Sequence, residues 1–424
     1  MRIRIAVVAA LLGSGTGLWL SSTYAAEAQP IKAQHGLAVF LNKVVVTHPE
    51  VLAASKAVRA AEFRARGASR PVYNPSATLS GETAEEDTYT AGLELPIDLW
   101  GKRAAHSSVG EQRLLAAEAR LELIRQQVAN ELLAALTVYQ ANRDQAQVAQ
   151  DAEQKLREFS AIAQRRYVAG DIGQVDLDLA RLAHAEAIKL SADAAAGLQE
   201  AQANLALIAR QRHAKWPELP EVLPDPGSTT LPGTHLISTL PQVKLAWLEL
   251  QTAEADIAVA RKEARADPTF GVEAGREGEE NLIGLSLSIP LFVRDPMTDE
   301  IDAAQADAEA ASVSAEDISN QAGLRVEAAQ RRYLMNYDAW QRWSEAAGDA
   351  LNRGLDRLNR LLESGDIDAG FYLLQLQQRL DAKSAGAELK GNAWQAWGDW
   401  LAATAQFQQW LDGTLPAAHF TEMK

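Results

Sequence analysis

The stretch RRYVAGDIGQVDLDLA, at Arg165–Ala180, places a Gly-Asp pair inside an otherwise unbroken helical pattern. A second stretch, NRLLESGDIDAGFYLLQ at Asn359–Gln375, repeats the Gly-Asp-Ile motif near the other end of the 424-residue chain. Glycine suits the left-handed conformation that ends a helix, and an aspartate can cap the next helix. Each stretch therefore predicts a turn between two long helices. The turn residues are a helix-ending glycine, a capping aspartate and an isoleucine in apolar contact: Gly170, Asp171 and Ile172, then Gly365, Asp366 and Ile367.

The two turns belong to a longer internal repeat. Four landmark pairs occur in one order, at separations of 192, 193, 194 and 195 positions: Pro49 with Pro241, Pro75 with Pro268, Pro96 with Pro290, and Gly170 with Gly365. The halves meet at the Pro-rich stretch KWPELPEVLPDPGSTTLPGT, which is typical of a linker. The sequence thus predicts two tandem repeats, 29–220 and 221–424. Each has a helix, a β-hairpin (about 74–100 and about 268–293) and a long helical hairpin with its tip at 170 or 365.

The N-terminus has the pattern of an export signal. Two arginines precede the apolar run IAVVAALLGSGTGLWL, and SSTYAAEA offers small-residue cleavage sites after Ala26 or Ala28. A membrane anchor is the competing interpretation, but glycines dilute the run and no stop-transfer flank follows. We therefore expect residues 1–28 to be a cleaved signal peptide. No later apolar run is long enough to cross a bilayer as a helix.

The remaining chain favours very long helices. No proline occurs between positions 96 and 217 or between 296 and 416, and an interior proline would cost a helix about 3 kcal/mol. A helix over 102–169 would extend about 100 Å at about 1.5 Å per residue. Apolar residues recur every seven positions, the spacing of coiled coils: Leu114, Leu121, Val128 and Ala135. Tryptophans recur every third residue near the C-terminus, which favours core packing: Trp394, Trp397 and Trp400. The predicted fold class is mainly α, a long coiled coil with a small β part.

Two segments alternate apolar and polar residues with a period of two: YTAGLELPIDLW at Tyr89–Trp100 and LIGLSLSIPLFV at Leu282–Val293. Shorter partner strands precede each of them. One apolar face fits either a soluble sheet packed on a core or a barrel wall that faces lipid. Long helices, however, offer such a sheet no compact core.

Four strands cannot close a barrel alone, and unpaired strand edges are not tolerated in hydrocarbon. Either the sheet is soluble, or several chains contribute four strands each to one barrel. Three chains would form a 12-stranded transmembrane barrel. The acids of the polar face would then point into its lumen: Glu82, Glu94, Asp98 and Glu273.

Composition and motifs argue against several classes of protein. The chain has no cysteine, which excludes disulfides, thiolate metal sites and a lipid-modified cysteine. A net charge of −15 disfavours nucleic acid as a partner. LWGKRAAH lacks the upstream glycine of a phosphate loop, LAHAEA lacks zinc-protease spacing, and the seven histidines are scattered. We therefore expect no enzyme activity, no resident metal site and no cofactor.

Three motifs together, NPSATLSGE, LELPIDLWGKRAA and RRYVAGDIGQVDLDLARLAHAEA, resemble the TolC-type outer-membrane efflux channels. The resemblance covers essentially the whole chain after the signal. HPEVLAASKAVRAAE with YNPSATLSGE and PIDLWGKRAAH is most similar to the branch paired with heavy-metal resistance pumps for cobalt, zinc, cadmium or copper. This resemblance implies a homotrimer with a 12-stranded barrel in outer-membrane lipid and a helical barrel, or tunnel, across the periplasm. The helical tips would then dock to a periplasmic adaptor and an inner-membrane proton-driven pump.

The resemblance also implies a narrow pore near the tips, often with acidic side chains. The candidates nearest to the tips are Asp176, Asp178 and Asp368. Phe371 and Leu374 stand where some relatives carry carboxylates, which puts an acidic ring from the second repeat in doubt. We favour solvated helix-start residues over a cation filter for these aspartates.

The function implied is a passive outer-membrane conduit for divalent heavy-metal cations. One alternative is a channel for organic drug efflux or secretion. A different class of alternative is a periplasmic adaptor or a structural coiled-coil protein. An adaptor would carry one helical hairpin beside a domain of many short strands, whereas this chain predicts two hairpins and no such domain.

Overall fold

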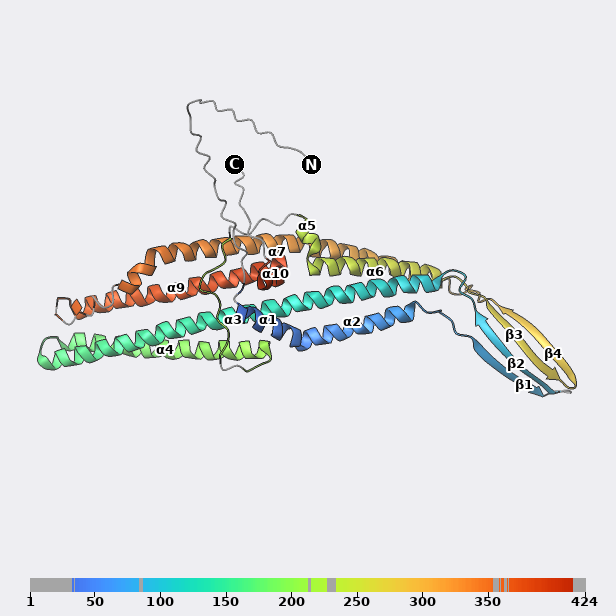
Figure 1. The fold of residues 1–424 in the computed structure, drawn as a ribbon, viewed down its shortest axis with the longest axis horizontal. Helices are drawn as coiled ribbons and strands as arrows, with labels where there is room; N and C mark the ends of the chain where they lie inside the picture. The colour runs from blue at the N-terminus through green and yellow to red at the C-terminus, as the bar shows by residue number, and fades with distance from the viewer. Residues whose placement is uncertain are drawn as a thin grey trace, which may run out of the picture.

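The computed structural model describes residues 33, 35–83, 87–212, 215–226, 234–353, 358, 360–361, 364 and 366–414. The chain is elongated, with a four-stranded sheet at one end and the turns of the long helical hairpins at the other (Figure 1). The predicted signal peptide, 1–28, and the predicted tip residue Gly365 lie outside the described residues.

The elements occur in the same order in both halves. The first half contains α1 (His35–Thr47), α2 (Pro49–Ala68), β1 (Ser76–Thr83), β2 (Asp87–Pro96), α3 (Lys102–Ala169) and α4 (Gln174–Ala209). The second contains α5 (Thr234–Thr239), α6 (Pro241–Glu263), β3 (Thr269–Glu277), β4 (Glu280–Ser288), α7 (Thr298–Arg353), α9 (Ala369–Thr404) and α10 (Phe407–Asp412). This order confirms the mainly α fold and the tandem repeats.

Prolines set where the shorter helices begin. Pro49 and Pro241 occupy the first turns of α2 and α6, where a missing N–H costs nothing. Only His48 lies between α1 and α2, and the two helices meet at a bend of 51°. Among the described helices, none is by itself long and apolar enough to cross a membrane, although the bent pair of α1 and α2 passes that test of length and composition together.

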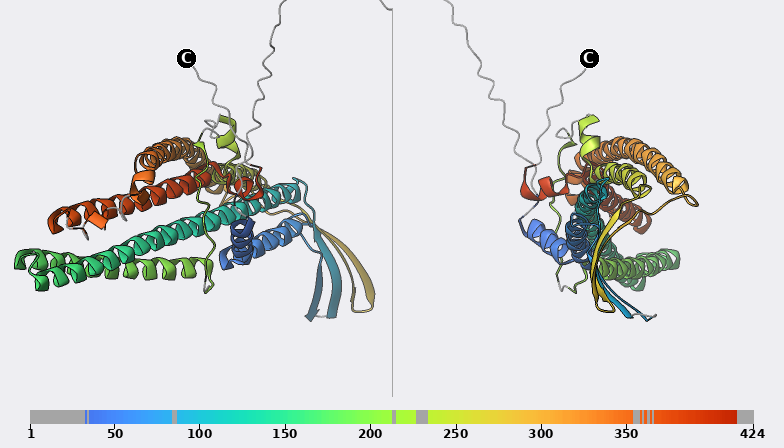
Figure 2. Two further views of the ribbon diagram at one scale, coloured as in Figure 1. Left: turned by 60° about the vertical axis from the view of Figure 1, so that its left-hand side comes forward. Right: turned by 90° about the vertical axis from the view of Figure 1, so that its right-hand side faces the viewer.

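The four strands form one antiparallel sheet in the order β1-β2-β3-β4. The hairpins of the two repeats join along β2 and β3, where Ala91 lies opposite Ala274. β1 and β4 are the edges of the sheet. Gly278, with φ 55°, occupies the tight turn between β3 and β4. Figure 2 shows the sheet as a single curved layer that projects beyond the helices.

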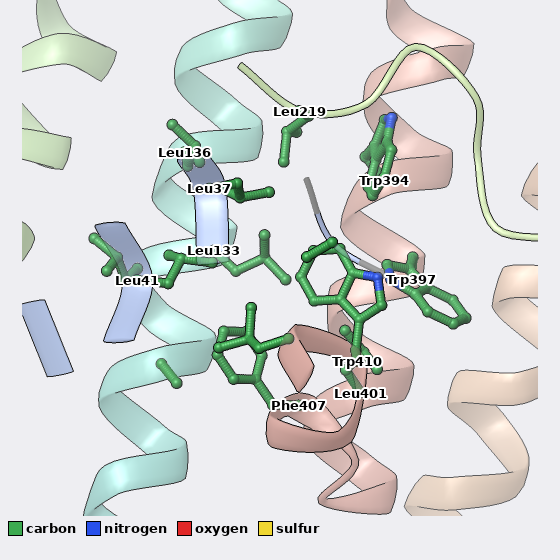
Figure 3. Close-up of a cluster of buried hydrophobic side chains, with 14 of the residues drawn as sticks. Leu37, Leu41, Leu133, Leu136, Leu219, Trp394, Trp397, Leu401, Phe407 and Trp410 are labelled. Carbon is green, nitrogen blue, oxygen red and sulfur yellow. The ribbon is translucent and has the colours of Figure 1, made fainter. Parts of the chain in front are cut away.

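The main core lies midway along the helices, where α1, α3, α9 and α10 meet (Figure 3). Trp397 stacks on Trp400 with ring centroids 5.0 Å apart and meets Trp410 edge-on at 6.4 Å. Leu133 and Leu136 of α3 are fully buried in the same cluster. The predicted core role of the tryptophan stripe is therefore confirmed.

Candidate functional site

The first candidate region is the sheet, whose two faces differ in chemistry. Leucine, isoleucine, valine, phenylalanine and tyrosine side chains gather on one face, and many are more than half exposed. Leu79, Ile283 and Leu285 are 85%, 84% and 83% exposed, respectively. Leaving one such side chain in water costs about 1.5–3 kcal/mol relative to burial, so this face needs an apolar partner.

Three of the four predicted lumen acids share the opposite face. Glu94 lies opposite Gly271, and Glu273 lies between Gly92 and Gly284 on the neighbouring strands. Glu82 lies on the same face, because it follows Ser76, the partner of Glu94, by an even number of residues along β1. A Cβ added at Gly284 would lie 2.5 Å from Glu273 Oε1, so the Glu273 side chain lies directly over this glycine. The second face is polar and acidic.

The structure corrects the placement of Asp98. β2 ends at Pro96, and the Asp98 carboxylate accepts the backbone N–H groups of Lys102 and Arg103 at 2.8 and 2.9 Å. Partial burial would raise the pKa of Asp98, but the backbone donors outweigh it and hold the pKa below its usual value. Asp98 therefore caps α3. The period-two pattern continued past the end of the strand, which is why the sequence placed Asp98 with the lumen acids.

A buried ionic network joins the two repeats where the helices meet the sheet. The Lys102 ammonium lies 3.1 Å from Asp267 Oδ2 and 3.3 Å from Glu263 Oε2. The Tyr73 hydroxyl donates to Asp267 at 2.8 Å, and His106 Nε2 lies 2.9 Å from Glu263 Oε1. The side chains of Lys102 and Asp267 are only 5% and 3% exposed.

Burial and hydrogen bonding together shift two pKa values in this network. Burial opposes the ammonium, but hydrogen bonds with Asp267 and its neighbours outweigh this and raise the pKa of Lys102. Burial, together with the hydrogen bond to Asp267, raises the pKa of Tyr73. Sequence reasoning missed the network. The available signal was that the second repeat carries Asp-Pro where the first carries Asn-Pro, a change that adds one charge.

The second candidate region is the turn between α3 and α4. Gly170 has φ 85°, in the left-handed region, and its N–H bonds the Tyr167 carbonyl at 3.0 Å. The N–H of Asp171 bonds the Arg166 carbonyl at 2.9 Å, which completes a common helix-ending motif. The predicted role of Gly170 in ending the helix is confirmed.

The predicted capping roles of Asp171 and Asp366 are wrong. α4 begins one residue after Gly173, and Asp176 accepts the N–H of that glycine at 3.2 Å. α9 is capped by Asp368, which accepts the N–H of Phe371 at 2.8 Å. Each cap lies further along the chain because the turn occupies two more residues before the returning helix begins.

Asp366 instead accepts the Ser364 hydroxyl at 2.6 Å, and Asp178 accepts the side-chain amide of Gln174 at 2.8 Å. Of the three aspartates proposed near the pore, Asp178 and Asp368 are exposed and Asp176 is half-buried, and all three lie at the starts of α4 and α9. Their role in a pore stays a prediction.

The tip isoleucines, Ile172 and Ile367, are half-buried against a second core near the turns. In this core the rings of Phe159 and Tyr372 stack with centroids 4.9 Å apart and so connect α3 to α9. Apolar side chains remain exposed around it: Val168, Val175, Leu182, Phe371 and Leu374. Within the described residues, no three histidine, aspartate or glutamate side chains gather as a metal site.

The sequence model of the outer membrane efflux protein family matches residues 42–209, which run from α1 to the end of α4. This part of the chain belongs to that family. The matched residues include both strands of the first hairpin, the buried Lys102 and the turn at Gly170, so the efflux-protein domain contains both candidate regions of the first repeat.

Two curated proteins are similar to the chain. The cobalt-zinc-cadmium resistance protein CzcC of Cupriavidus metallidurans is 27% identical over 236 residues, 54% of this chain and 56% of that protein. The nickel-cobalt-cadmium resistance protein NccC of Alcaligenes xylosoxydans xylosoxydans is 27% identical over 306 residues, 68% of this chain and 65% of that protein. The chain thus spans somewhat over half the length of these relatives.

Solved structures show the same fold over nearly the whole chain. A crystal structure of CusC, described in terms of transmembrane channel formation, has a TM-score of 0.73 at 16% identity and covers 88% of this chain and 92% of that chain. The CmeC outer membrane channel of Campylobacter jejuni has a TM-score of 0.72 at 16% identity, with 86% and 85% covered. The chain has the fold of TolC-type outer-membrane channels.

Proposed function

We propose that the chain is the outer-membrane channel of a tripartite efflux system. It lies in the outer membrane, extends into the periplasm and passively conducts divalent heavy-metal cations to the exterior. The observation that carries this proposal is the sheet, which exposes one apolar face, one acidic polar face and two unpaired edges. A barrel wall in a membrane has an apolar face toward lipid and, around a water-filled lumen, a polar inner face, but it leaves no strand edge open.

A homotrimer removes the open edges. Three chains of four strands each give twelve strands, in which β1 of one chain pairs with β4 of the next. The apolar face then contacts outer-membrane lipid, and Glu82, Glu94 and Glu273 line a water-filled lumen. Closure also places the long helices of three chains side by side as a periplasmic tunnel.

The helical turns at the far end are the proposed contact with the periplasmic adaptor and the inner-membrane proton-driven pump. The exposed apolar side chains beside the turns support that contact. The residues proposed to take part are Gly170, Asp171 and Ile172 in the first repeat and Gly365, Asp366 and Ile367 in the second. Energy for export comes from the pump in this proposal, so the channel needs only to open.

The metal cargo is supported by the names of the two curated relatives, both of which include cobalt and cadmium. An acidic lumen raises the local concentration of cations by long-range attraction, without any site that would hold them tightly. The cations therefore pass along the glutamates as substrate.

Reconstitution of the purified chain tests the channel. We expect a native mass three times that of the mature chain and, in planar bilayers under a KCl gradient, a reversal potential that shows cation preference. Replacing Glu94 and Glu273 together by glutamine should reduce that preference, whereas Glu62→Gln on the exposed face of α2 should not. A monomer without conductance would contradict the proposal.

Deletion of the gene tests the cargo. Growth would be measured in zinc, cobalt, cadmium, copper and a panel of organic drugs, with a plasmid-borne wild-type copy as control. Sensitivity to metals alone, restored by the wild type and not by a copy altered at Gly170 and Gly365, is the expected result. Sensitivity to drugs alone would retain the channel and reject the metal cargo.

A further inference from the structure

The apolar pattern of the sheet continues beyond the ends of its strands. Leu99 follows β2, and Ile289 follows β4, each in step with the apolar face of its strand. Both are more than half exposed. Together with Trp100, Arg265, Ala266 and Pro268 they line a hollow of about 500 Å³. The hollow therefore opens at the border between the apolar sheet face and the helices.

The polar side of this hollow is one arginine. The Arg265 guanidinium lies 4.7 Å from the centre of the Trp100 ring, and the Trp100 indole N–H donates to the Ala266 carbonyl at 2.8 Å. Stacking on a ring that is itself hydrogen-bonded holds the guanidinium at the hollow. Within the described part of the chain, no carboxylate lies within ion-pair distance of Arg265. Further from the sheet, by contrast, Arg113 pairs with Asp256 at 3.0 Å.

The surroundings are positive although the whole chain carries a net charge of −15. The four segments at this border, 59–73, 97–106, 261–268 and 289–296, hold ten lysines and arginines and five carboxylates. Three of those carboxylates are already engaged: Asp98 caps α3, while Asp267 and Glu263 hold Lys102. Lys102 itself is buried, but the other lysines and arginines outnumber the two remaining carboxylates, so the surface at this level carries excess positive charge.

We propose that the hollow binds one anionic phospholipid of the leaflet on the helical side of the membrane. This inference rests on the proposed function, because it requires the apolar face to lie in a bilayer. The phosphate pairs with the Arg265 guanidinium, whose planar donors match two phosphate oxygens. The acyl chains lie over Leu99 and Ile289. Trp100 lies at the membrane–water interface, where tryptophan is enriched in membrane proteins.

Lipid binding to the intact trimer tests the site. The wild type, purified in a neutral detergent, would be titrated with dioleoylphosphatidylglycerol and observed by native mass spectrometry. One basic residue near an anionic surface contributes about 1 kcal/mol, so Arg265→Gln should weaken binding about fivefold. The matched control is Arg325→Gln, an exposed arginine about 40 Å along α7 from the start of that helix at about 1.5 Å per residue. It should leave binding unchanged.

A second readout locates the bound lipid. Phosphatidylglycerol with brominated acyl chains quenches tryptophan on contact, and Trp100→Phe should lower the quenched fraction relative to the wild type. Equal quenching in both proteins, or equal binding by the wild type and the Arg265 variant, would overturn the lipid site.

The channel proposal is tested independently by conductance in the same phosphatidylglycerol bilayers. If the wild type conducts and the Arg265→Gln variant binds lipid as tightly as the wild type, only the lipid site is rejected. A wild type that forms neither trimer nor conductance rejects both.

Discussion

Removing the charge of Asp267 should lower the stability of the chain more than breaking any exposed ion pair would. Asp267→Asn keeps the shape of the side chain and leaves the Lys102 ammonium, 5% exposed, with Glu263 as its remaining carboxylate at 3.3 Å. Breaking a buried pair costs about 3–5 kcal/mol. The lower figure applies here, because Glu263 still compensates part of the charge.

The measurement is thermal unfolding of the purified chain by circular dichroism, at one fixed protein and detergent concentration. A chain of this length has an unfolding entropy of about 0.8 kcal/mol/K, so a loss of about 3 kcal/mol lowers Tm by about 4 °C. Asp256→Asn is the matched control. It breaks the Arg113–Asp256 pair, whose side chains are 61% and 38% exposed, and should lower Tm by about 1 °C at most, because such pairs contribute less than about 1 kcal/mol.

A double variant separates lost charge from lost packing. Lys102→Met alone leaves Asp267 unpaired, whereas Lys102→Met with Asp267→Asn leaves neither charge buried. The double variant should therefore recover much of the stability lost in either single variant. Equal Tm shifts for Asp267→Asn and Asp256→Asn, or strictly additive effects in the double variant, would refute the view that the buried pair is coupled.

Three further changes test the caps, the turn and the core. The pKa of Asp98 is lower in the folded chain than its ordinary value of 3.8, so its carboxylate stabilises the fold at any pH above 3.8. This stabilisation is lost as pH falls from 3.8 through the lower pKa of the folded chain. The wild type should thus be about 1 kcal/mol more stable than Asp98→Asn at pH 7, and the Tm difference should close below about pH 4. Gly170→Ala, at φ 85°, should cost about 1–2 kcal/mol and increase protease cleavage at the turn, whereas Gly67→Ala within α2 should stabilise by about 0.5–1 kcal/mol. Trp397→Ala should cost about 3–5 kcal/mol in the central core, and a loss below about 1 kcal/mol in denaturant unfolding would contradict its burial.

The long helices were predictable because their signals are local. The absence of proline and the seven-residue spacing indicated a helix over 102–169, and α3 spans those residues. The period of two likewise located all four strands. Their ends were harder, since Asp98 continues the alternation but its carboxylate caps α3. A pattern of side chains records which face a residue occupies, and it does not record where backbone pairing stops.

The turns show a similar limit. Glycine at 170 was identified from its backbone preference, and its φ of 85° agrees. The caps were placed too early, at Asp171 and Asp366, because the start of a returning helix depends on how the turn packs. Ile172 and Ile367 are half-buried against the core around Phe159, and the cap positions are Gly173 and Asp368, each two residues beyond the predicted cap. Asp176 accepts the N–H of Gly173, and Asp368 accepts that of Phe371.

The sequence by itself determined the repeats, the long helices, the strands and the chemistry of the two sheet faces, because each follows from preferences of residues near one another in the chain. Only the tertiary structure decided which charges are buried. Tyr73 and Asp267 are 194 positions apart, and they meet with Lys102 because the hairpins of the two repeats pair along β2 and β3. The same packing buries Asp267 beside Lys102 and leaves Arg265 exposed. Burial and partners depend on the whole packed arrangement, so no local pattern could assign them.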